Sequence, residues 1–468
     1  MLNKYRVFKI KQVIESEKRF IKKYSTKKIF ELAAFKITEF INKNFSKKKI
    51  FFICGPGNNG RDGIYSNALL KKKKINTRVY EISKESNIFS EKKLNELLEE
   101  SDVVVDCIFG LGLNRKIQNK FKKIIQLINC CKNKVIISID LPSGINSDSG
   151  DILGISVKAN ITLAMGVYKP AHFLNPSKNY CGEVSLLNLN LPNLKKNIYP
   201  QIFLLEKKIL ENKFPSFPSN IHKYNKGHVH VIGGVMAGAS RIVAYSARKT
   251  GCGLSSIIIN DKDLKFYSGT EPGTIIRSSK DKIDSKKADC LVIGPGLGKS
   301  FSKKQFLEIL KIYQCPIIID ADAFNIFKNC KEQFYKVLQK RKNVILTPHE
   351  GEFQRIFNQK NDKISNCLQA SKLIFNNIVL KGNDTIVAFQ DQMVWINNNA
   401  SSSLATAGSG DMLCGIMSSL IAQKMEIKYS ILASIYIHGQ LSKQRNCSTV
   451  EDFMKKIPQV FRYLKNNN

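Results

Sequence analysis

A glycine-rich segment with two asparagines and an aspartate could bind a phosphate group or a cation. Residues 55–63, GPGNNGRDG, follow the apolar run 50–54 and precede a helical pattern. Glycines between a strand and a helix let backbone N–H groups approach a phosphate, and the helix N-terminus favours its negative charge. A tight turn without a ligand would use the same glycines, so the loop alone leaves both interpretations open. The amide and carboxylate groups favour the binding interpretation.

Two further carboxyl groups stand where apolar runs of the first half end. Asp106 closes the run in VVVDCIFGLG, and Asp140 closes the run in VIISIDLPSG. The carboxyl ends of neighbouring parallel strands meet at the crevice where open α/β sheets bind ligands. Either aspartate alone could be a helix cap or a strand terminator. Together with the glycine-rich loop they predict a ligand site in the first half of the chain.

The segment TAGSGDM, with Asp411 directly after the last glycine, could hold a negatively charged group. Flexible backbone at the start of a helix offers several N–H groups that have no partner within the helix. An aspartate at this position also favours the helix dipole without any chemistry.

These groups need a framework of strands and helices to position them. Residues from about 10 to 46 predict helices, because apolar positions recur at three- and four-residue spacing. Short apolar runs predict strands at 50–54, 77–82, 103–107, 135–139, 161–165 and 184–187. Helical or loop segments separate several of these runs, which predicts mainly parallel strands with crossover helices in an α/β fold.

The alternating pattern stops at about 205–226, where the sequence is charged and contains prolines. It resumes with predicted strands at 228–232, 254–259, 290–293, 316–319, 344–346, 378–380, 385–389 and 393–396, and with helices at 412–423 and 429–441. A chain of 468 residues fits two domains of ordinary size. We therefore predict domains at residues 1–208 and 209–468.

The formal net charge of +36, taken alone, suggests a nucleic acid or an anionic membrane as partner. The lysines greatly outnumber the arginines, however, and are scattered through nearly every segment, so we expect no specific nucleic-acid partner and no membrane partner. No apolar stretch is long enough to cross a bilayer, and the N-terminus lacks the apolar segment of a signal peptide. The twelve cysteines show no zinc-binding spacing and predict free thiols. We expect a cytoplasmic protein.

Three motifs of the first half, GPGNNGRDG, VVVDCIFGLG and IDLPSGINSDSG, resemble those of the NAD(P)H-hydrate epimerase family. They occur in the family's order across nearly all of residues 1–205, and the resemblance implies a Rossmann-like three-layer domain. It also implies that Asn59, Asp106 and Ser143 bind potassium, and that Asp140 is the acid–base residue that opens and recloses the hydrated ring. Substrate contacts are implied for Asp140 and for two loops, which comprise Asn58, Asn59, Gly60, Arg61 and Asp62, and Gly110, Leu111, Gly112, Leu113, Asn114, Arg115 and Lys116.

Arg61 departs from the pattern of this family, which usually has glycine at the position. The arginine side chain could crowd a close approach of the backbone to the substrate. It could instead add a contact to a phosphate group.

Six motifs of the second half resemble the nucleotide-dependent NAD(P)H-hydrate dehydratase family of the ribokinase-like superfamily. HKYNKGHVHVIGG, MAGASRIVAYSARKTGCGL, LVIGPGLGKS, IIIDADAFN, LTPHEGEF and VLKGNDTIVA, together with TAGSGD, cover essentially residues 222–468 in the family's order. The resemblance implies a ribokinase-like α/β domain in which Asp411 deprotonates the accepting hydroxyl. It implies dinucleotide contacts at Ala239, Gly298, His349 and Asp411, nucleotide contacts at Lys381, Gly382, Asn383, Asp384, Thr385, Gly408, Ser409 and Gly410, and a magnesium ion held through water by Glu352.

The two resemblances together imply a bifunctional enzyme that repairs hydrated NADH and NADPH. The first domain would interconvert the R and S hydrates. The second would remove water from the S-hydrate with ADP or ATP as co-substrate, and ADP, giving AMP and phosphate, is the first choice. We also expect a homo-oligomer.

Two other functions stay open at this point. One is a ribokinase-like kinase of a small hydroxylated metabolite beside an inactive first domain, which the PHEGE and KGNDT segments disfavour. The other is an RNA-binding module, which the charge of +36 keeps open. Asp106, Asp140 and Ser143 disfavour that module, because a scaffold has no need of a cation site.

Overall fold

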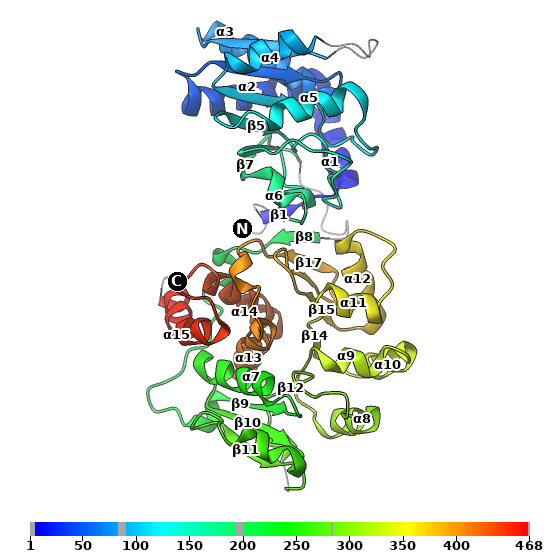
Figure 1. Ribbon diagram of the computed structural model, residues 1–468, viewed down its shortest axis with the longest axis vertical. Helices are drawn as coiled ribbons and strands as arrows, with labels where there is room; N and C mark the ends of the chain where they lie inside the picture. The colour runs from blue at the N-terminus through cyan, green and yellow to red at the C-terminus, as the bar shows by residue number, and fades with distance from the viewer. Residues whose placement is uncertain (1–4, 83–89, 193–200, 282–283, 467–468) are drawn as a thin grey trace. The chain divides into compact units, whose positions relative to one another are not determined.

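The computed structural model describes residues 5–82, 90–192, 201–281 and 284–466. The chain divides between Gln201 and Ile202 into two compact units, called here the first and the second unit. Each unit is an α/β fold built around its own largely parallel sheet (Figure 1). Within the described ranges, no helix combines the length and the apolar character that crossing a bilayer requires.

The elements of the first unit confirm the six strands predicted there, each within one residue at either end. They are β1 (Arg6–Val7), α1 (Ile10–Lys23), α2 (Thr26–Phe45), β2 (Ile50–Cys54), α3 (Asn58–Lys72), β3 (Thr77–Glu81), α4 (Glu91–Glu99), β4 (Val103–Cys107), α5 (Asn119–Asn129), β5 (Val135–Ile139), β6 (Ile161–Met165), the 3-10 helix η2 (Pro170–His172), α6 (Lys178–Cys181) and β7 (Glu183–Leu187). The predicted helical region 10–46 is α1 and α2. Strand β1 was not predicted, because two residues carry no periodicity.

The sheet of the first unit has the order β3-β2-β4-β5-β6-β7, and all of its neighbouring strands are parallel. The chain leaves β2 toward one side of the sheet to form β3 and then crosses to the other side to form β4. The carboxyl ends of β2 and β4 therefore flank a topological switch point, where open α/β sheets bind ligands. The register pairs Cys54 with Cys107, so the glycine-rich loop and the loop after Asp106 start at the same level.

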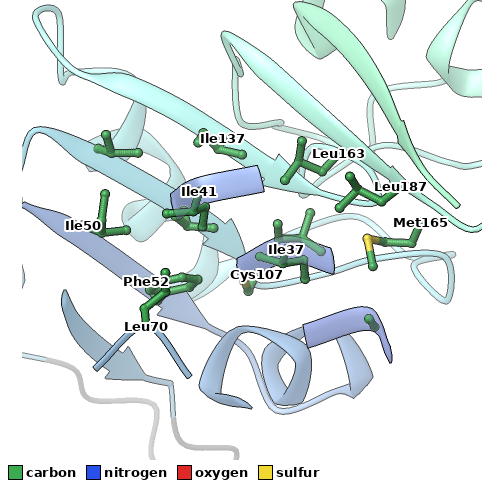
Figure 2. Packing of buried hydrophobic residues seen from close by; sticks show 14 of the residues in the cluster. Ile37, Ile41, Ile50, Phe52, Leu70, Cys107, Ile137, Leu163, Met165 and Leu187 are labelled. Carbon is green, nitrogen blue, oxygen red and sulfur yellow. The ribbon is translucent and has the colours of Figure 1, made fainter. Parts of the chain in front are cut away.

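Helices cover both faces of this sheet, which gives the predicted three layers. On one face, α2 and α3 pack through Ile37, Ile41 and Leu70 against strand residues such as Phe52 (Figure 2). On the other face, α4 and α5 pack on the alternate residues of the same strands, in a cluster that includes Phe51, Leu94, Val104 and Ile124. Both sides of each central strand are buried, as expected for a parallel sheet between helical layers.

The second unit contains the eight strands predicted there and two further ones. Its elements are β8 (Gln201–Leu204), η3 (Lys207–Leu210), η4 (Lys223–Lys226), β9 (His228–Ile232), α7 (Ala237–Thr250), β10 (Leu254–Ile259), η5 (Asp261–Tyr267), β11 (Ile275–Ser278), η6 (Ser285–Lys287), β12 (Cys290–Ile293), α8 (Lys303–Ile312), β13 (Ile317–Ile319), α9 (Asp322–Phe327), α10 (Lys331–Gln339), β14 (Val344–Leu346), α11 (Glu350–Ile356), α12 (Lys363–Ile374), β15 (Asn377–Leu380), β16 (Ile386–Ala388), β17 (Met393–Ile396), η7 (Ser402–Leu404), α13 (Ser409–Ala422), α14 (Ile427–Leu441) and α15 (Val450–Asn466).

The sheet of the second unit runs β8-β17-β16-β15-β14-β13-β12-β9-β10-β11. Strands from β11 to β15 are parallel, whereas β15, β16 and β17 pair antiparallel. The neighbours β9 and β12 again flank a switch point. Strands β8 and β11 escaped prediction because each is a short segment at the margin of the alternating pattern. Strand β8 lies almost wholly in the second unit, although the predicted boundary at residue 208 assigns it to the first domain.

Ile37 on α2 provides a test of the first core. Replacing Ile37 by alanine should lower the free energy of unfolding of the first unit by about 2–5 kcal/mol, because the fully buried side chain leaves a cavity against the sheet. Phe35 lies on the same helix but is 47% exposed. Phe35→Ala is the matched control and should change stability by no more than about 0.5 kcal/mol. Calorimetric unfolding of both variants tests this assignment, and equal effects would contradict it.

Candidate active sites

A cavity of about 660 Å³ lies at the switch point of the first sheet. It is bounded by α1, by the loop after β2, by the loop after β4 and by the ends of β5 and β6. The structure brings most of the predicted residues of the first site together here: Asn58, Asn59, Asp62, Gly110, Leu111, Gly112, Leu113, Asn114, Arg115 and Asp140 all line the cavity. Lys116, Gly60 and Arg61 lie outside this lining.

Gly60 and Arg61 shape the turn at the start of α3. A Cβ atom at position 60 would lie 1.8 Å from the carbonyl oxygen of Gly55, so only glycine allows this close approach. Arg61 is exposed, and its backbone N–H donates to the carbonyl oxygen of Gly57 at 3.2 Å. Arg61 does not line the cavity, and both of its expected effects stay predictions.

The three residues with an implied potassium role form a connected polar cluster. The carboxylate of Asp106 is fully buried and accepts hydrogen bonds from the backbone N–H of Ile108 and from the backbone and hydroxyl of Ser143, the last at 2.6 Å. A fourth hydrogen bond comes from the Ser138 hydroxyl at 2.8 Å. Burial raises the pKa of Asp106, although these hydrogen bonds act in the opposite direction. The Asn59 amide donates to the carbonyl oxygens of Phe109 and Ile139 at 3.1 and 3.2 Å, which joins the two loops.

Asp140 is held in an unusual conformation by a buried lysine and a buried histidine. Its φ angle is +67°, a left-handed conformation that is uncommon outside glycine and that aspartate tolerates better than most residues. Its Oδ1 accepts from the ammonium of Lys169 and, at 3.2 Å, from the backbone N–H of Met165. His172 accepts the Lys169 backbone N–H at Nδ1 (3.0 Å), so its Nε2–H donates to the Asp140 carbonyl oxygen at 2.7 Å. Burial lowers the pKa of His172 to about 4, so the ring is neutral.

Two more carboxyl groups face this cavity. Burial raises the pKa of Asp62 to about 8, and the neighbouring carboxylates of Asp140 and Glu17 add to the effect. Burial also raises the pKa of Glu17, on α1, while the ammonium of Lys169 opposes the shift. The cavity therefore combines one buried ion pair, Lys169–Asp140, with a carboxyl group that is largely protonated at neutral pH.

The second site is built where α13 begins. Gly408 is its N-cap with φ +83°, a conformation that favours glycine, and Ser409, Gly410 and Asp411 form the first turn. His438 lies with Nε2 3.0 Å from both the hydroxyl and the carbonyl oxygen of Ser409. Burial lowers the pKa of His438 to about 4, so it supports the turn as a neutral group. The Ser409 N–H donates to the Thr406 carbonyl oxygen at 3.3 Å, and the start of a helix at Gly410 and Asp411 favours a bound anion.

A buried ion pair lies beneath this turn. Asp320, which directly follows β13, is 1% exposed, and its Oδ1 accepts from the Lys381 ammonium at 2.5 Å. A Cβ atom placed on Gly410 would lie only 3.2 Å from the same ammonium nitrogen. The thiol of Cys414, one turn further along α13, donates to the other oxygen of Asp320 at 3.2 Å. Burial opposes the charge of Lys381, but the carboxylates of Asp320 and Glu352 raise its pKa above the usual value.

Asp411 lies in the field of this ion pair. Burial raises the pKa of Asp411 to about 7, and the carboxylate of Asp320 adds to the shift, whereas the Lys381 ammonium opposes it. A carboxyl group with a pKa near neutrality can accept and return a proton at working pH. The position next to an anion-binding turn and this pKa together suit a general base for an acceptor hydroxyl.

His349 and Glu352 cap helix α11 and face each other. The Nδ1 of His349 accepts from the backbone N–H groups of Gly351 and Glu352 at 3.0 and 3.3 Å, and Glu352 returns the bond by accepting the His349 N–H at 2.8 Å. The His349 side chain is 54% exposed, so it is accessible to a ligand as well as structural. Burial raises the pKa of Glu352, and the Lys381 ammonium, 4.0 Å away, lowers it.

The remaining predicted positions of the second site surround the same end of the sheet. Gly298, after β12, donates its N–H to the Asp322 carboxylate at 2.9 Å, and Ala239 lies in the first turn of α7. In the predicted nucleotide-binding segment, the Thr385 hydroxyl bonds the Gly382 carbonyl at 2.6 Å. Asp384 pairs with Lys363 at 2.7 Å, which stabilises the turn that contains Asn383. Within the described residues, no group of three or more His, Cys, Asp or Glu side chains could hold a metal ion by itself.

Sequence reasoning missed three groups that the fold brings to the first site. Glu17 comes from α1, and Lys169 and His172 come from the segment around η2, all distant from the motifs. No local pattern marks Glu17, which lies in an ordinary charged helix. The segment YKPAH contains Lys169 and His172, and its proline after a lysine was the only available signal.

Comparisons with known proteins agree with the division of the chain. The family model described as NAD(P)H-hydrate dehydratase matches residues 229–455. The model described as YjeF-related protein N-terminus matches residues 26–92 and 81–171. The two matches thus fall on the second and the first unit respectively.

Two similar proteins match this chain over most of their length. The bifunctional NAD(P)H-hydrate repair enzyme Nnr of Dictyoglomus turgidum is 31% identical over 94% of this chain and 95% of its own length. The enzyme of the same name from Helicobacter pylori is 30% identical over 92% of this chain and 95% of its own. A crystal structure of a ribokinase-like superfamily protein from Enterococcus faecalis is 25% identical and has a TM-score of 0.49, covering 58% of this chain and 99% of that protein.

The coupling between Asp320 and Asp411 can be measured directly. Asp320→Asn should lower the pKa of Asp411 below its value of about 7, because it removes the anion that disfavours ionisation. Carbon-13 NMR of protein labelled at the aspartate carboxyls would follow the titration, with Asp411→Asn to assign the signal. Asp391→Asn, which removes a surface carboxyl paired with Lys428, is the control and should leave the titration in place. An unchanged midpoint in Asp320→Asn would contradict the coupling.

Proposed function

This chain belongs to the bifunctional NAD(P)H-hydrate repair enzymes, and on that premise we propose how its two units divide the work. The first unit epimerises the R and S hydrates of NADH and NADPH. The second unit dehydrates the S-hydrate with ADP as co-substrate and releases AMP and phosphate. The observation that carries the proposal is the anion-binding turn of α13 with Asp411 beside it and the Lys381–Asp320 ion pair beneath it.

Dehydration needs a better leaving group than hydroxide. Asp411 would take the proton of the ring hydroxyl as its oxygen attacks the terminal phosphorus of ADP, and AMP would leave. The backbone N–H groups at Gly408, Ser409 and Gly410 would neutralise the phosphoryl group in transfer. The phosphate ester would then depart with the C–O bonding electrons, driven by the lone pair of the ring nitrogen. Loss of the adjacent ring proton restores NADH or NADPH.

The nucleotide would lie on the other side of the same turn. Lys381, Gly382, Asn383, Asp384 and Thr385 would contact it, and the buried ammonium of Lys381 supports a phosphate there because it lies next to Gly410. Glu352 would hold magnesium through water, which suits an ion that takes most of its ligands from phosphates and solvent. Magnesium, when bound, neutralises phosphate charge. Ala239, Gly298 and His349 would contact the hydrated dinucleotide.

Epimerisation would take place in the first cavity. Asp140 would remove the hydroxyl proton so that the ring opens, and would return a proton when the ring recloses on the other face. The substrate would contact Asn58 to Asp62 and the loop from Gly110 to Lys116. The volume of about 660 Å³ supports a ligand of this size class.

A potassium ion fits the first site by its donor chemistry. Asp106 is fully buried, and among the described residues no lysine or arginine forms an ion pair with it. A monovalent cation would supply the missing positive charge, and the amide, carboxylate and hydroxyl oxygens of Asn59, Asp106 and Ser143 suit a hard cation. Potassium, when bound, would stabilise negative charge on the substrate side. A homo-oligomer, a cytoplasmic location and the lack of a specific nucleic-acid or membrane partner stay predictions from the sequence.

The division of labour predicts separable losses of activity. Asp411→Asn should lower the rate of dehydration by about 10²–10⁴-fold while it spares epimerisation, because only the second unit loses its base. Asp140→Asn should do the opposite. A mixture of both hydrate epimers with ADP, followed by NADH absorbance and phosphate release, distinguishes the two defects. Loss of both activities from either single change would contradict the proposal.

Potassium removal should affect only the first unit. Exchange of potassium for a bulky organic cation should lower the epimerisation rate by about tenfold or more, because Asp106 then lacks a countercharge. Ser143→Ala should raise the potassium concentration needed for half-maximal rate. Dehydration of the purified S-hydrate in the same buffers is the control. An epimerisation rate that is the same with either cation would contradict the assignment of potassium to this site.

A further inference from the structure

Three carboxyl groups and one ammonium group line the first cavity, although a single acid–base residue was expected there. Glu17 comes from α1, Asp62 from the second turn of α3, and Asp140 from the end of β5. Lys169 precedes η2. These four side chains come from separate elements, so their convergence is a result of tertiary structure.

Asp140 and Asp62 differ sharply in their partners. Asp140 is 5% exposed and forms an ion pair with Lys169, whose side chain is itself only 1% exposed. Asp62, by contrast, has a buried Oδ1 atom without a hydrogen-bond partner in the described part of the chain. A buried carboxylate oxygen without a partner is costly, whereas a protonated carboxyl group tolerates that environment.

The charged groups around Asp62 act in the same sense. Glu17 on α1 and Asp140 after β5 face it, and with its burial they raise the pKa of Asp62 to about 8. From the end of β4, the thiol of Cys107 interacts with Asp62, and the buried Asp106 interacts with that thiol. Among the described residues that line the cavity, the cationic side chains are Arg115 and Lys169. The ammonium of Lys169 is bound to Asp140 and to the carbonyl oxygen of Met165, the latter at 2.7 Å. The described lining of the cavity therefore combines the Lys169–Asp140 ion pair with a neighbouring carboxyl group, Asp62, that is in no such pair.

We propose that Asp62 is the general acid and Asp140 the general base for opening the hydrated ring, with Lys169 as the positioning residue that keeps their roles apart. This proposal rests on the epimerase function proposed above. Asp140 takes the hydroxyl proton, the carbon–oxygen double bond forms, the ring carbon–nitrogen bond breaks, and the nitrogen receives the proton of Asp62. After rotation of the aldehyde, closure runs in reverse: the nitrogen returns its proton to Asp62 and Asp140 protonates the oxygen. No proton is gained or lost.

Lys169 acts through Asp140. Its ammonium binds Oδ1 of Asp140, and its backbone N–H binds His172, which in turn binds the Asp140 carbonyl oxygen. This ring of contacts holds Asp140 at φ +67°. Removal of the ammonium would free the carboxylate to rotate and would leave a buried charge without a partner.

The decisive variant is Asp62→Asn in the full-length protein, assayed for epimerisation of purified R-hydrate between pH 6 and 9 with the uncatalysed rate subtracted. The wild type should lose kcat above about pH 8, because the acid is then ionised. Asp62→Asn should lower kcat by about 10²-fold or more and abolish that decline. Asp62→Glu should keep part of the activity, and its kcat should decline at a shifted pH. That result would show that the loss in Asp62→Asn comes from the missing carboxyl group and not from a change of fold.

Two controls accompany these variants. Asp102→Asn removes a carboxyl at the opposite end of β4, where it accepts the Lys49 N–H, and should behave as the wild type. Dehydration of purified S-hydrate should be unchanged in every variant. If the wild type itself does not epimerise, the proposed function fails. If the wild type is active and Asp62→Asn only raises KM while kcat and its decline above pH 8 persist, Asp62 merely binds substrate and the inference fails.

Lys169 is tested by Lys169→Met and Lys169→Arg. The methionine variant should lose kcat by about tenfold or more with little change in KM, and the arginine variant should recover part of the loss, because it restores a donor to Oδ1 of Asp140. Wild-type kcat in Lys169→Met would overturn the positioning role.

Discussion

A buried carboxyl group at the end of a parallel strand must find hydrogen bonds or a positive charge, because water cannot reach it there. Both units are organised around this constraint. In the first, Asp106 receives four hydrogen bonds and Asp140 receives the Lys169 ammonium. In the second, Asp320 receives Lys381 and a thiol. The groups that bind each of these carboxylates come from loops or helices that follow other strands. The buried carboxylates therefore also hold these segments together at the switch points.

The same arrangement sets the charge states that chemistry requires. In each unit one carboxylate is neutralised by a lysine, while a second carboxyl group nearby has no such partner and its pKa rises, to about 8 for Asp62 and about 7 for Asp411. Pairs of titratable groups whose environments drive their pKa values apart are a common basis for acid–base catalysis. One unit would use the pair to move protons at a ring, and the other would use it beside a phosphoryl group.

Glycine is required where these polar clusters come close to the backbone. At position 60, a Cβ atom would lie 1.8 Å from the Gly55 carbonyl oxygen, so only glycine allows this turn. Gly410 allows α13 to start directly above the Lys381 ammonium. In both units a helix begins at the loop, and the N-terminus of a helix favours negative charge. In the second unit, the close approach at Gly410 thus depends on the buried Lys381–Asp320 ion pair that lies next to it.

The sequence alone determined the elements whose signal is local. Alternating apolar runs predicted the central strands from Ile50–Cys54 to Met393–Ile396, because burial on both faces leaves a continuous apolar pattern. The motifs predicted Asp140, Asp411 and the glycine turns, because close backbone approach and acid–base chemistry restrict the residue types. Strands β1, β8 and β11 gave no such signal, being short and at the margins. Only the tertiary structure brought Glu17 and Lys169 to the first cavity, His172 to Asp140, and Asp320 close to Gly410. Those contacts join residues far apart in the chain, and charge pairing across a fold leaves no periodicity in the sequence.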